Sequence, residues 1–227
     1  MKSLKYSSII IYTPSNIYKY TFQFHEAFIY EFLNLKINAV SLKNMEELIQ
    51  IINKDILVIF LGNPKHEDLL KILKLPNNTD IIIYETECIY NNSIHLSSYY
   101  KCKKVISVWT YSMHNYDVLQ QNNIPSYYFP FGYSKYYDYR QNIKTIKNNV
   151  ITVLCDRLDD RLNRIKHLNT ENKKAWNNKE WQKEIADNHI VINLHKYENS
   201  KDFHSPRFVP LLSNGIRIIS EHCPQKD

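Results

Sequence analysis

Short apolar runs alternate along this chain with segments of helical period. Many of the runs are rich in β-branched residues and apolar throughout, as in SSIIIY at 7–12 and DILVIFLG at 55–62. Strands of this kind are typical of a parallel sheet covered on both faces. We expect strands at 7–12, 37–42, 55–62, 80–87, 104–109 and 126–130, and then at 150–155, 189–195 and 215–221.

The segments between these runs have apolar residues at helical spacing. After a loop at 13–21, the spacing of Phe24, Phe28 and Phe32 predicts a helix. Asn44 and Ser112 are suited to cap two further helices. After the first helix, we expect one that follows Asn44, with Glu46 and Glu47 in its first turn, and then helices at 65–75, 93–101, 113–122, 156–168, 171–188 and 205–214.

This order of elements predicts an α/β protein with two halves. The first, residues 1–133, is expected to be a Rossmann-like doubly wound parallel sheet, and residues 134–149 a linker. Residues 150–227 are expected to form a smaller, truncated Rossmann-like half, because one αβ unit is missing between residues 168 and 189. No GxGxxG fingerprint follows the first strand, which disfavours a dinucleotide site of the usual kind.

An aromatic and proline-rich stretch, YYFPFGY at 127–133, lies at the expected boundary. Pro125 and Pro130 fix φ and oppose a helix, whereas Gly132 permits a turn that a side chain would hinder. Only three glycines occur in the 227 residues, so this one is informative. We interpret the stretch as the crossover between the halves; the alternative is an ordinary turn within one domain.

The chain is 44% apolar and 23% charged, which is typical of a globular protein, and its net charge is +6. A positive charge raises the question of nucleic-acid binding. However, the basic residues are dispersed, and the densest run is only Lys101-Cys102-Lys103-Lys104. We therefore expect no nucleic-acid partner, and a field that favours a small anionic substrate.

The four cysteines include no CxxC pair and no cluster at zinc spacing. They are typical of reduced thiols in a cytoplasmic protein. The apolar run near the amino terminus is too short for a signal peptide or a membrane span. We expect a cytoplasmic protein with no membrane span, no metal and no cofactor.

Six segments together resemble a family of GT-B-type glycosyltransferases from giant viruses and some microbes. The resemblance covers about half of the chain, in the family's order. The segments are YETECI (84–89), VWTYSMHN (108–115), YYFPFGYS (127–134), VLCDRLDDRLNRIKHL (153–168), VINLHKYE (191–198) and SPRFVPLLSNGIRIISE (205–221).

The resemblance implies a GT-B fold that transfers a sugar, without a metal, from a nucleotide-sugar donor to a glycan or glycosylated acceptor. Its setting would be the cytoplasm, the host's if the protein is viral. The donor diphosphate would be stabilised by arginines and helix amino termini. The implied donor-binding residues are Arg157, Arg161, Asn193, His195, Arg207 and Glu221, and the acceptor-side residues are Tyr84, Trp109 and His114.

An inverting transfer needs a base near the acceptor hydroxyl. Glu87 matches the family's glutamate and follows a strand, so it is the first candidate, with His25 and His114 in reserve. The chain departs from the family at Thr110 and Asp156, where aspartate and glycine are usual.

Two other functions remain open. One is a catalytically degenerate GT-B-like module that binds a sugar, a nucleotide or a partner protein. The other is a nucleic-acid-associated factor. We also expect self-association, because a truncated second half would expose sheet edge and apolar surface.

Overall fold

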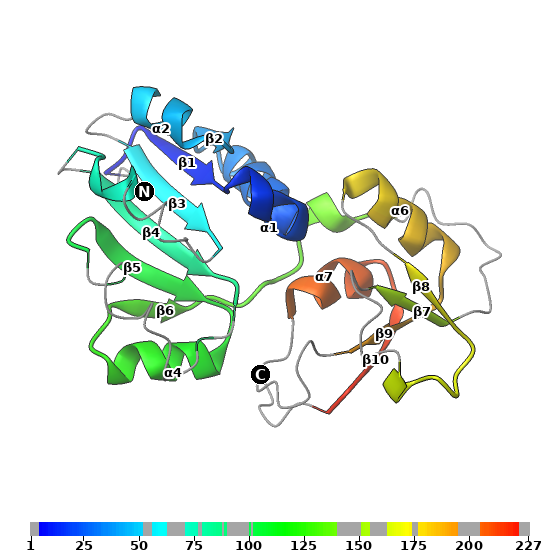
Figure 1. Ribbon diagram of the computed structural model, residues 1–227. Helices are drawn as coiled ribbons and strands as arrows, with labels where there is room; N and C mark the ends of the chain where they lie inside the picture. Colours follow the sequence, from blue (N-terminus) through cyan, green and yellow to red (C-terminus); the bar gives the residue numbers. More distant parts are fainter. Residues whose placement is uncertain are drawn as a thin grey trace. The chain divides into compact units, whose positions relative to one another are not determined.

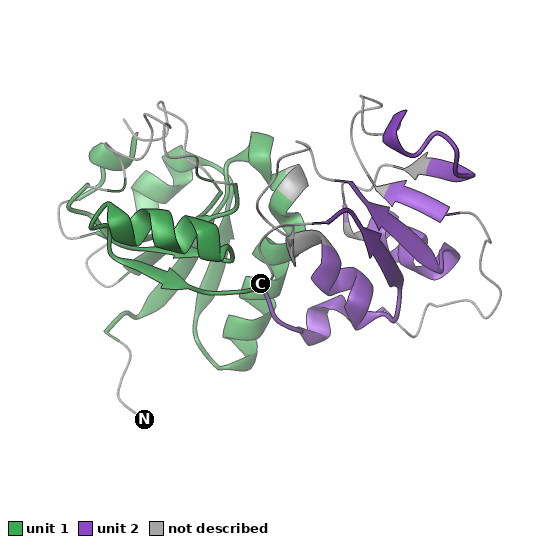
Figure 2. Ribbon diagram, turned by 90° about the horizontal axis from the view of Figure 1, so that it is seen from below, with its two compact units in different colours: residues 1–130 green, residues 131–227 purple. Residues whose placement is uncertain are grey.

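The computed structural model describes residues 5–51, 56–62, 71–76, 79–87, 89, 100, 102–139, 151–154, 163–173, 177–194 and 205–222. The chain divides into two compact units, residues 1–130 and 131–227 (Figure 2). Each unit contains a parallel sheet with helices, so the protein is α/β and compatible with a Rossmann-like architecture.

The sheet of the first unit has six parallel strands in the order β2-β1-β3-β4-β5-β6 (Figure 1). The order reverses next to β1, as in doubly wound sheets, where ligands bind outside the carboxyl ends of the strands. All six strands expected in this half are confirmed. They are β1 (Ser8–Tyr12), β2 (Ala39–Leu42), β3 (Ile56–Leu61), β4 (Asp80–Glu85), β5 (Val105–Thr110) and β6 (Ser126–Tyr128).

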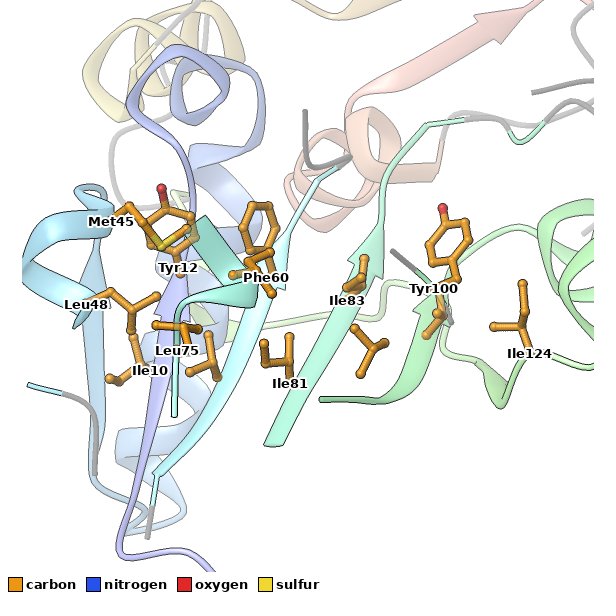
Figure 3. Packing of buried hydrophobic residues seen from close by; sticks show 14 of the residues in the cluster. Ile10, Tyr12, Met45, Leu48, Phe60, Leu75, Ile81, Ile83, Tyr100 and Ile124 are labelled. Atoms are coloured by element: carbon orange, nitrogen blue, oxygen red, sulfur yellow. The ribbon is translucent and has the colours of Figure 1, made fainter. Parts of the chain in front are cut away.

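Helices α1 (Ser15–Asn34), α2 (Met45–Ile51) and α4 (Met113–Gln121) accompany this sheet. Residues of α2 and α4 share one buried cluster with alternate residues of the strands, including Ile10, Phe60 and Ile83 (Figure 3). On β4, Tyr84 alternates with Ile83 and therefore faces the other side, where Phe28 of α1 packs against it. Helix α1 thus covers the opposite face from α2 and α4.

The amino-terminal part of α1 corrects the expected loop at 13–21, because the helix begins at Ser15. Pro14 occupies the N-cap position, and the first turn closes when the Tyr18 N–H donates to the Pro14 carbonyl. Polar Thr21 and Gln23 are buried in this helix, which hides its apolar face from a periodicity count. The two predicted caps are confirmed: Asn44 accepts from the Glu46 N–H and Ser112 accepts from the Asn115 N–H.

The second unit has a four-stranded parallel sheet in the order β10-β9-β7-β8. The three strands expected here are confirmed as β7, β9 and β10, and the expected helix at 205–214 as α7. The bounds are β7 (Ile151–Leu154), β8 (Thr170–Lys173), α6 (Asn178–Asp187), β9 (Ile190–Asn193), α7 (Ser205–Ser213) and β10 (Arg217–Ser220).

The unit expected to be missing between residues 168 and 189 is present, as β8 and α6. Strand β8 has the polar sequence TENK, which the sequence analysis assigned in part to a helix. Among the described residues it lies at the edge of the sheet and pairs with β7 alone. An edge strand is defined by its backbone pairing and needs few apolar side chains, which explains the wrong prediction.

Residues 134–139, expected to begin a linker, contain the 3-10 helix η2 (Lys135–Tyr137). Asn214, which follows α7, binds this segment with its side chain. Its Nδ2 donates to the Tyr137 carbonyl, and its Oδ1 accepts from the Tyr139 N–H at 2.8 Å. The segment therefore belongs to the packed part of the second unit. Residues 140–149, the helix expected at 93–101 except Tyr100, and most of the helices expected at 65–75 and 156–168 lie outside the described residues.

Candidate functional site

Polar side chains gather in two places at the carboxyl edge of the first sheet. One place, here called the β4–β5 edge, contains Glu85, Glu87, Tyr100, Thr110 and Asn115. The other, the β1–β2 edge, contains Thr13, Tyr18, His25, Ser41 and Lys43. Both lie at the carboxyl ends of the strands, and the β1–β2 edge is the one next to the point where the strand order reverses.

Asn115, fully buried in the first turn of α4, organises the β4–β5 edge. Its Oδ1 accepts from the Ile89 N–H at 2.7 Å, and its Nδ2 donates to the Glu87 carbonyl at 2.8 Å. Its Nδ2 also donates to Thr110 Oγ1 at 3.2 Å. One amide therefore joins the loop after β4 to the end of β5, with donors and acceptor all in use.

Glu85 ends β4 and is fully buried. Its Oε1 accepts from the Glu87 N–H at 2.9 Å, and its Oε2 contacts the Tyr100 hydroxyl. Burial raises the pKa of Glu85 to about 7, although the hydrogen bonds from Tyr100 and Glu87 act in the opposite direction. Glu85 was not among the residues predicted from the sequence, although its alternation with Ile81 and Ile83 indicates that it faces inward.

Glu87, the predicted base, lies in the loop after β4 with an exposed side chain. His114, the reserve base and acceptor-side candidate, is on α4, and its Nε2 lies 3.0 Å from the Ile89 carbonyl oxygen. That contact requires the proton on Nε2, because a carbonyl accepts. His114 is therefore a donor to the loop and has no basic nitrogen at that position.

Four aromatic rings form a cluster on the α1 face beside this edge: Phe28, Tyr84, Trp109 and Phe129. The rings of Trp109 and Phe129 stack with centroids 4.9 Å apart and planes at 25°. Tyr84 is buried, and its hydroxyl donates to the Phe129 carbonyl at 2.7 Å. Phe129 remains 42% exposed and Trp109 is half-buried, so the cluster presents an aromatic surface to solvent.

His25 is the centre of the β1–β2 edge and is fully buried in α1. Its Nδ1 lies 2.8 Å from Thr13 Oγ1, and its Nε2 contacts Ser41 Oγ. Burial, reinforced by the Lys43 charge, lowers the pKa of His25 to about 4. The buried Thr13 hydroxyl needs an acceptor, and Nδ1 provides it when the ring proton is on Nε2.

This tautomer makes His25 a donor to Ser41, so the ring has no free basic nitrogen and is a poor candidate for the base. Nearby, the Lys43 Nζ lies 3.4 Å from the centre of the Tyr18 ring. Burial, with a hydrogen bond to Glu26, raises the pKa of Tyr18. At this edge the His25 imidazole thus contacts the Thr13 and Ser41 hydroxyls, and the Lys43 cation contacts the Tyr18 ring.

In the second unit, Asn193 and Glu221 lie at the carboxyl ends of β9 and β10. The Glu221 N–H donates to the Asn193 carbonyl at 3.2 Å, and Asn193 Nδ2 donates to Ser220 Oγ at 3.1 Å. The Glu221 carboxylate accepts from Arg164 Nη1 at 2.6 Å, within a half-buried ion pair. Arg164 was not predicted, and nothing in its helical sequence context distinguishes it from its neighbours.

The remaining donor-binding candidates are Arg157, Arg161, His195 and Arg207. Arg157, Arg161 and His195 lie outside the described residues, and Arg207 is in α7 with a side chain that is not described. In the described part of the chain, no three His, Cys, Asp or Glu side chains are grouped as metal ligands would be. Among the same residues, no helix has both the length and the apolar character of a bilayer span.

The sequence was compared with protein-family models and with curated proteins. No protein-family model matches the sequence. No curated protein matches it either. The function must therefore be argued from the sites themselves.

Proposed function

We propose that this chain is a metal-independent glycosyltransferase of the GT-B type, which moves a sugar from a nucleotide-sugar donor to a glycan or glycosylated acceptor. Glu87 is the base in this proposal. The supporting observation is an exposed carboxylate at the carboxyl edge of a parallel sheet, in a loop held by buried side chains.

The aromatic cluster next to β4 and β5 supports an acceptor site in the first unit. Ligand sites combine aromatic surfaces with a few fixed polar groups. Trp109 and Phe129 provide such a surface, and Tyr84 fixes it through its hydrogen bond to the Phe129 carbonyl. Trp109 pairs with Tyr84 in the sheet, so the surface is adjacent to the strand that leads to Glu87.

The donor belongs to the second unit in this proposal. Asn193 and Glu221 lie together at the carboxyl ends of neighbouring parallel strands, where nucleotides bind in open α/β sheets. Arg164, paired with Glu221, joins Arg157, Arg161, His195 and Arg207 as a donor-side candidate. Arginines suit this role because they stay charged and bind phosphate in a bidentate manner.

The transfer is a single displacement. Glu87 takes the proton of the acceptor hydroxyl while its oxygen forms a bond to the anomeric carbon of the sugar. The bond from that carbon to the diphosphate breaks, and the diphosphate leaves with the electron pair. Arginine side chains stabilise the charge that develops on it.

The test is a screen of nucleotide sugars for thermal stabilisation, for hydrolysis and for transfer to glycan acceptors. We expect Glu87→Gln to keep donor stabilisation and to lower transfer by about 100-fold or more, the scale of general-base catalysis. Glu47→Gln is the matched control, since Glu47 is an exposed carboxylate on α2 of the same unit. No stabilisation by any nucleotide sugar would contradict the proposal.

One observation favours the alternative of a catalytically degenerate binding module. The Glu221 carboxylate, expected to contact the donor, is bound by Arg164. A nucleotide or sugar that stabilises the unaltered protein but is not turned over, and that stabilises Glu87→Gln equally, would support the binding module.

A further inference from the structure

We propose that Glu85 and Asn115 are positioning residues that hold Glu87 in place for proton transfer. This inference rests on the proposed glycosyltransferase function. Both side chains are buried, and they act on the reaction through the backbone of the exposed Glu87.

The two polar backbone groups of Glu87 are each bound by a buried side chain. The N–H donates to Glu85 Oε1 at 2.9 Å, and the carbonyl accepts from Asn115 Nδ2 at 2.8 Å. Exposed loop residues usually satisfy these groups with water or with neighbouring backbone. Fixing both peptide groups restricts φ and ψ at Glu87, and this directs its side chain.

The two holding residues are themselves anchored. The Asn115 N–H donates to Ser112 Oγ within the capped first turn of α4. The Asn115 Nδ2 donates to Thr110 Oγ1 at the end of β5. Glu85 is part of β4 and contacts the buried Tyr100. Strand, helix start and loop thus form one connected network, and networks of satisfied buried hydrogen bonds are rigid.

Glu85 also has an electrostatic effect on Glu87. Among the described residues, the ionisable groups that face Glu85 are Tyr100 and Glu87, and the Glu87 charge contributes to the raised pKa of Glu85. Ionised Glu85 in turn places a like charge next to Glu87. The rate of transfer should therefore rise as Glu85 ionises near pH 7, and Glu85→Gln should remove this part of the pH profile.

The experiment compares Asn115→Asp with Asn188→Asp. Asn188 is a buried asparagine of the second unit, whose Nδ2 donates to the Glu184 carbonyl and whose Oδ1 accepts from Thr152. Each change replaces a donating amide by a carboxyl group at a buried site. We expect Asn115→Asp to lower kcat by about 10-fold to 100-fold with little change in KM, because a small misplacement of a catalytic group has this effect.

Both variants are assayed below their melting temperatures, so that differences in stability do not lower the rate. An equal loss of kcat in Asn188→Asp would overturn the inference, as would a Glu85→Gln variant that keeps the rise near pH 7. Transfer that requires Glu87 but is unchanged in Asn115→Asp would overturn the inference and leave the proposed function intact. Absence of transfer in the unaltered protein would overturn both.

Discussion

Each of the two edges of the first sheet buries one ionisable group, the basic His25 at the β1–β2 edge and the acidic Glu85 at the β4–β5 edge. Burial lowers the pKa of His25 to about 4 and raises that of Glu85 to about 7. Desolvation is the largest cause at both positions, because it disfavours the charged form of either group. His25 is consequently neutral at neutral pH, and Glu85 titrates there.

The edges differ in what the buried group holds. His25 contacts two side-chain hydroxyls, that of the buried Thr13 and that of the exposed Ser41, and no backbone group in these contacts. Glu85 instead holds the backbone of an exposed residue, Glu87. A buried polar group that binds only other side chains contributes to the stability of the fold. A buried polar group that orders the backbone of an exposed carboxylate residue is a candidate for function.

The largest expected effect is on stability at the β4–β5 edge. Asn115→Ala removes the hydrogen bonds that the Asn115 amide makes with the Ile89 N–H, the Glu87 carbonyl and Thr110 Oγ1, of which Thr110 Oγ1 keeps the Ser112 N–H as a donor. We expect the free energy of unfolding to fall by about 3 kcal/mol, since each unsatisfied buried group costs about 1–3 kcal/mol less any relaxation. Urea denaturation measures this loss. A decrease of less than about 1 kcal/mol in the free energy of unfolding would show that the loop does not depend on Asn115.

The second prediction concerns the pH dependence of stability. A histidine with a lowered folded pKa adds stability that is complete above pH 6.5 and is lost as pH falls toward 4. A carboxyl with a raised folded pKa adds stability that is complete below pH 4.5 and is lost as pH rises toward 7. Between about pH 4.5 and 6.5 the two contributions have opposite slopes of about 1.4 kcal/mol per pH unit and cancel.

Removing either group should reveal the pH dependence of stability that the other group contributes. Relative to the unaltered protein, Glu85→Gln should become more stable as pH rises from 4.5 to 6.5, and His25→Gln less stable, each by about 2–3 kcal/mol. Denaturation midpoints measured across this range provide the two difference curves. Parallel curves for all three proteins would contradict the comparison.

A smaller effect is expected from Tyr100→Phe, which removes the hydroxyl next to Glu85 Oε2 and keeps the ring. The free energy of unfolding should fall by about 1–2 kcal/mol at pH 8, where Glu85 is ionised, because the lost hydrogen bond is to a charged group. The loss should be smaller at pH 5. Equal losses at the two pH values would show that Tyr100 does not stabilise the ionised carboxyl.

The smallest effect is expected from Ser41→Ala at the β1–β2 edge. Ser41 is exposed, so water replaces its hydroxyl as the acceptor for His25 Nε2. Stability should change by about 0.5 kcal/mol or less. Ser15→Ala, at another exposed hydroxyl, is the control in the same thermal melts, and a much larger loss in Ser41→Ala would show that the serine is essential to His25.

Most of the fold of the first unit could be predicted from the sequence because its central strands β1, β3 and β4 are largely apolar on both faces. The run ILVIFL of β3 is buried at every position, so the pattern and the structure agree. Polar elements were predicted less well. Strand β8 and the first turns of α1 depend on pairing and packing partners that are distant in sequence.

The candidate site was predictable only in its position. The sequence places Tyr84, Glu87 and Trp109 at strand ends by counting residues, and the structure brings them to one edge of the sheet. It does not reveal that Asn115 binds the backbone of Glu87, since these residues are 28 positions apart. His25 was a reserve candidate for the base, but its buried contacts make it a poor one.

The sequence by itself determined where this chain forms strands and most of its helices, because apolar period and capping residues act over a few neighbouring positions. Only the tertiary structure decided which of its ionisable groups are buried and what they hold. Burial and hydrogen bonding depend on groups brought together from distant segments, and these set the pKa values and the rigidity of the loop that presents Glu87.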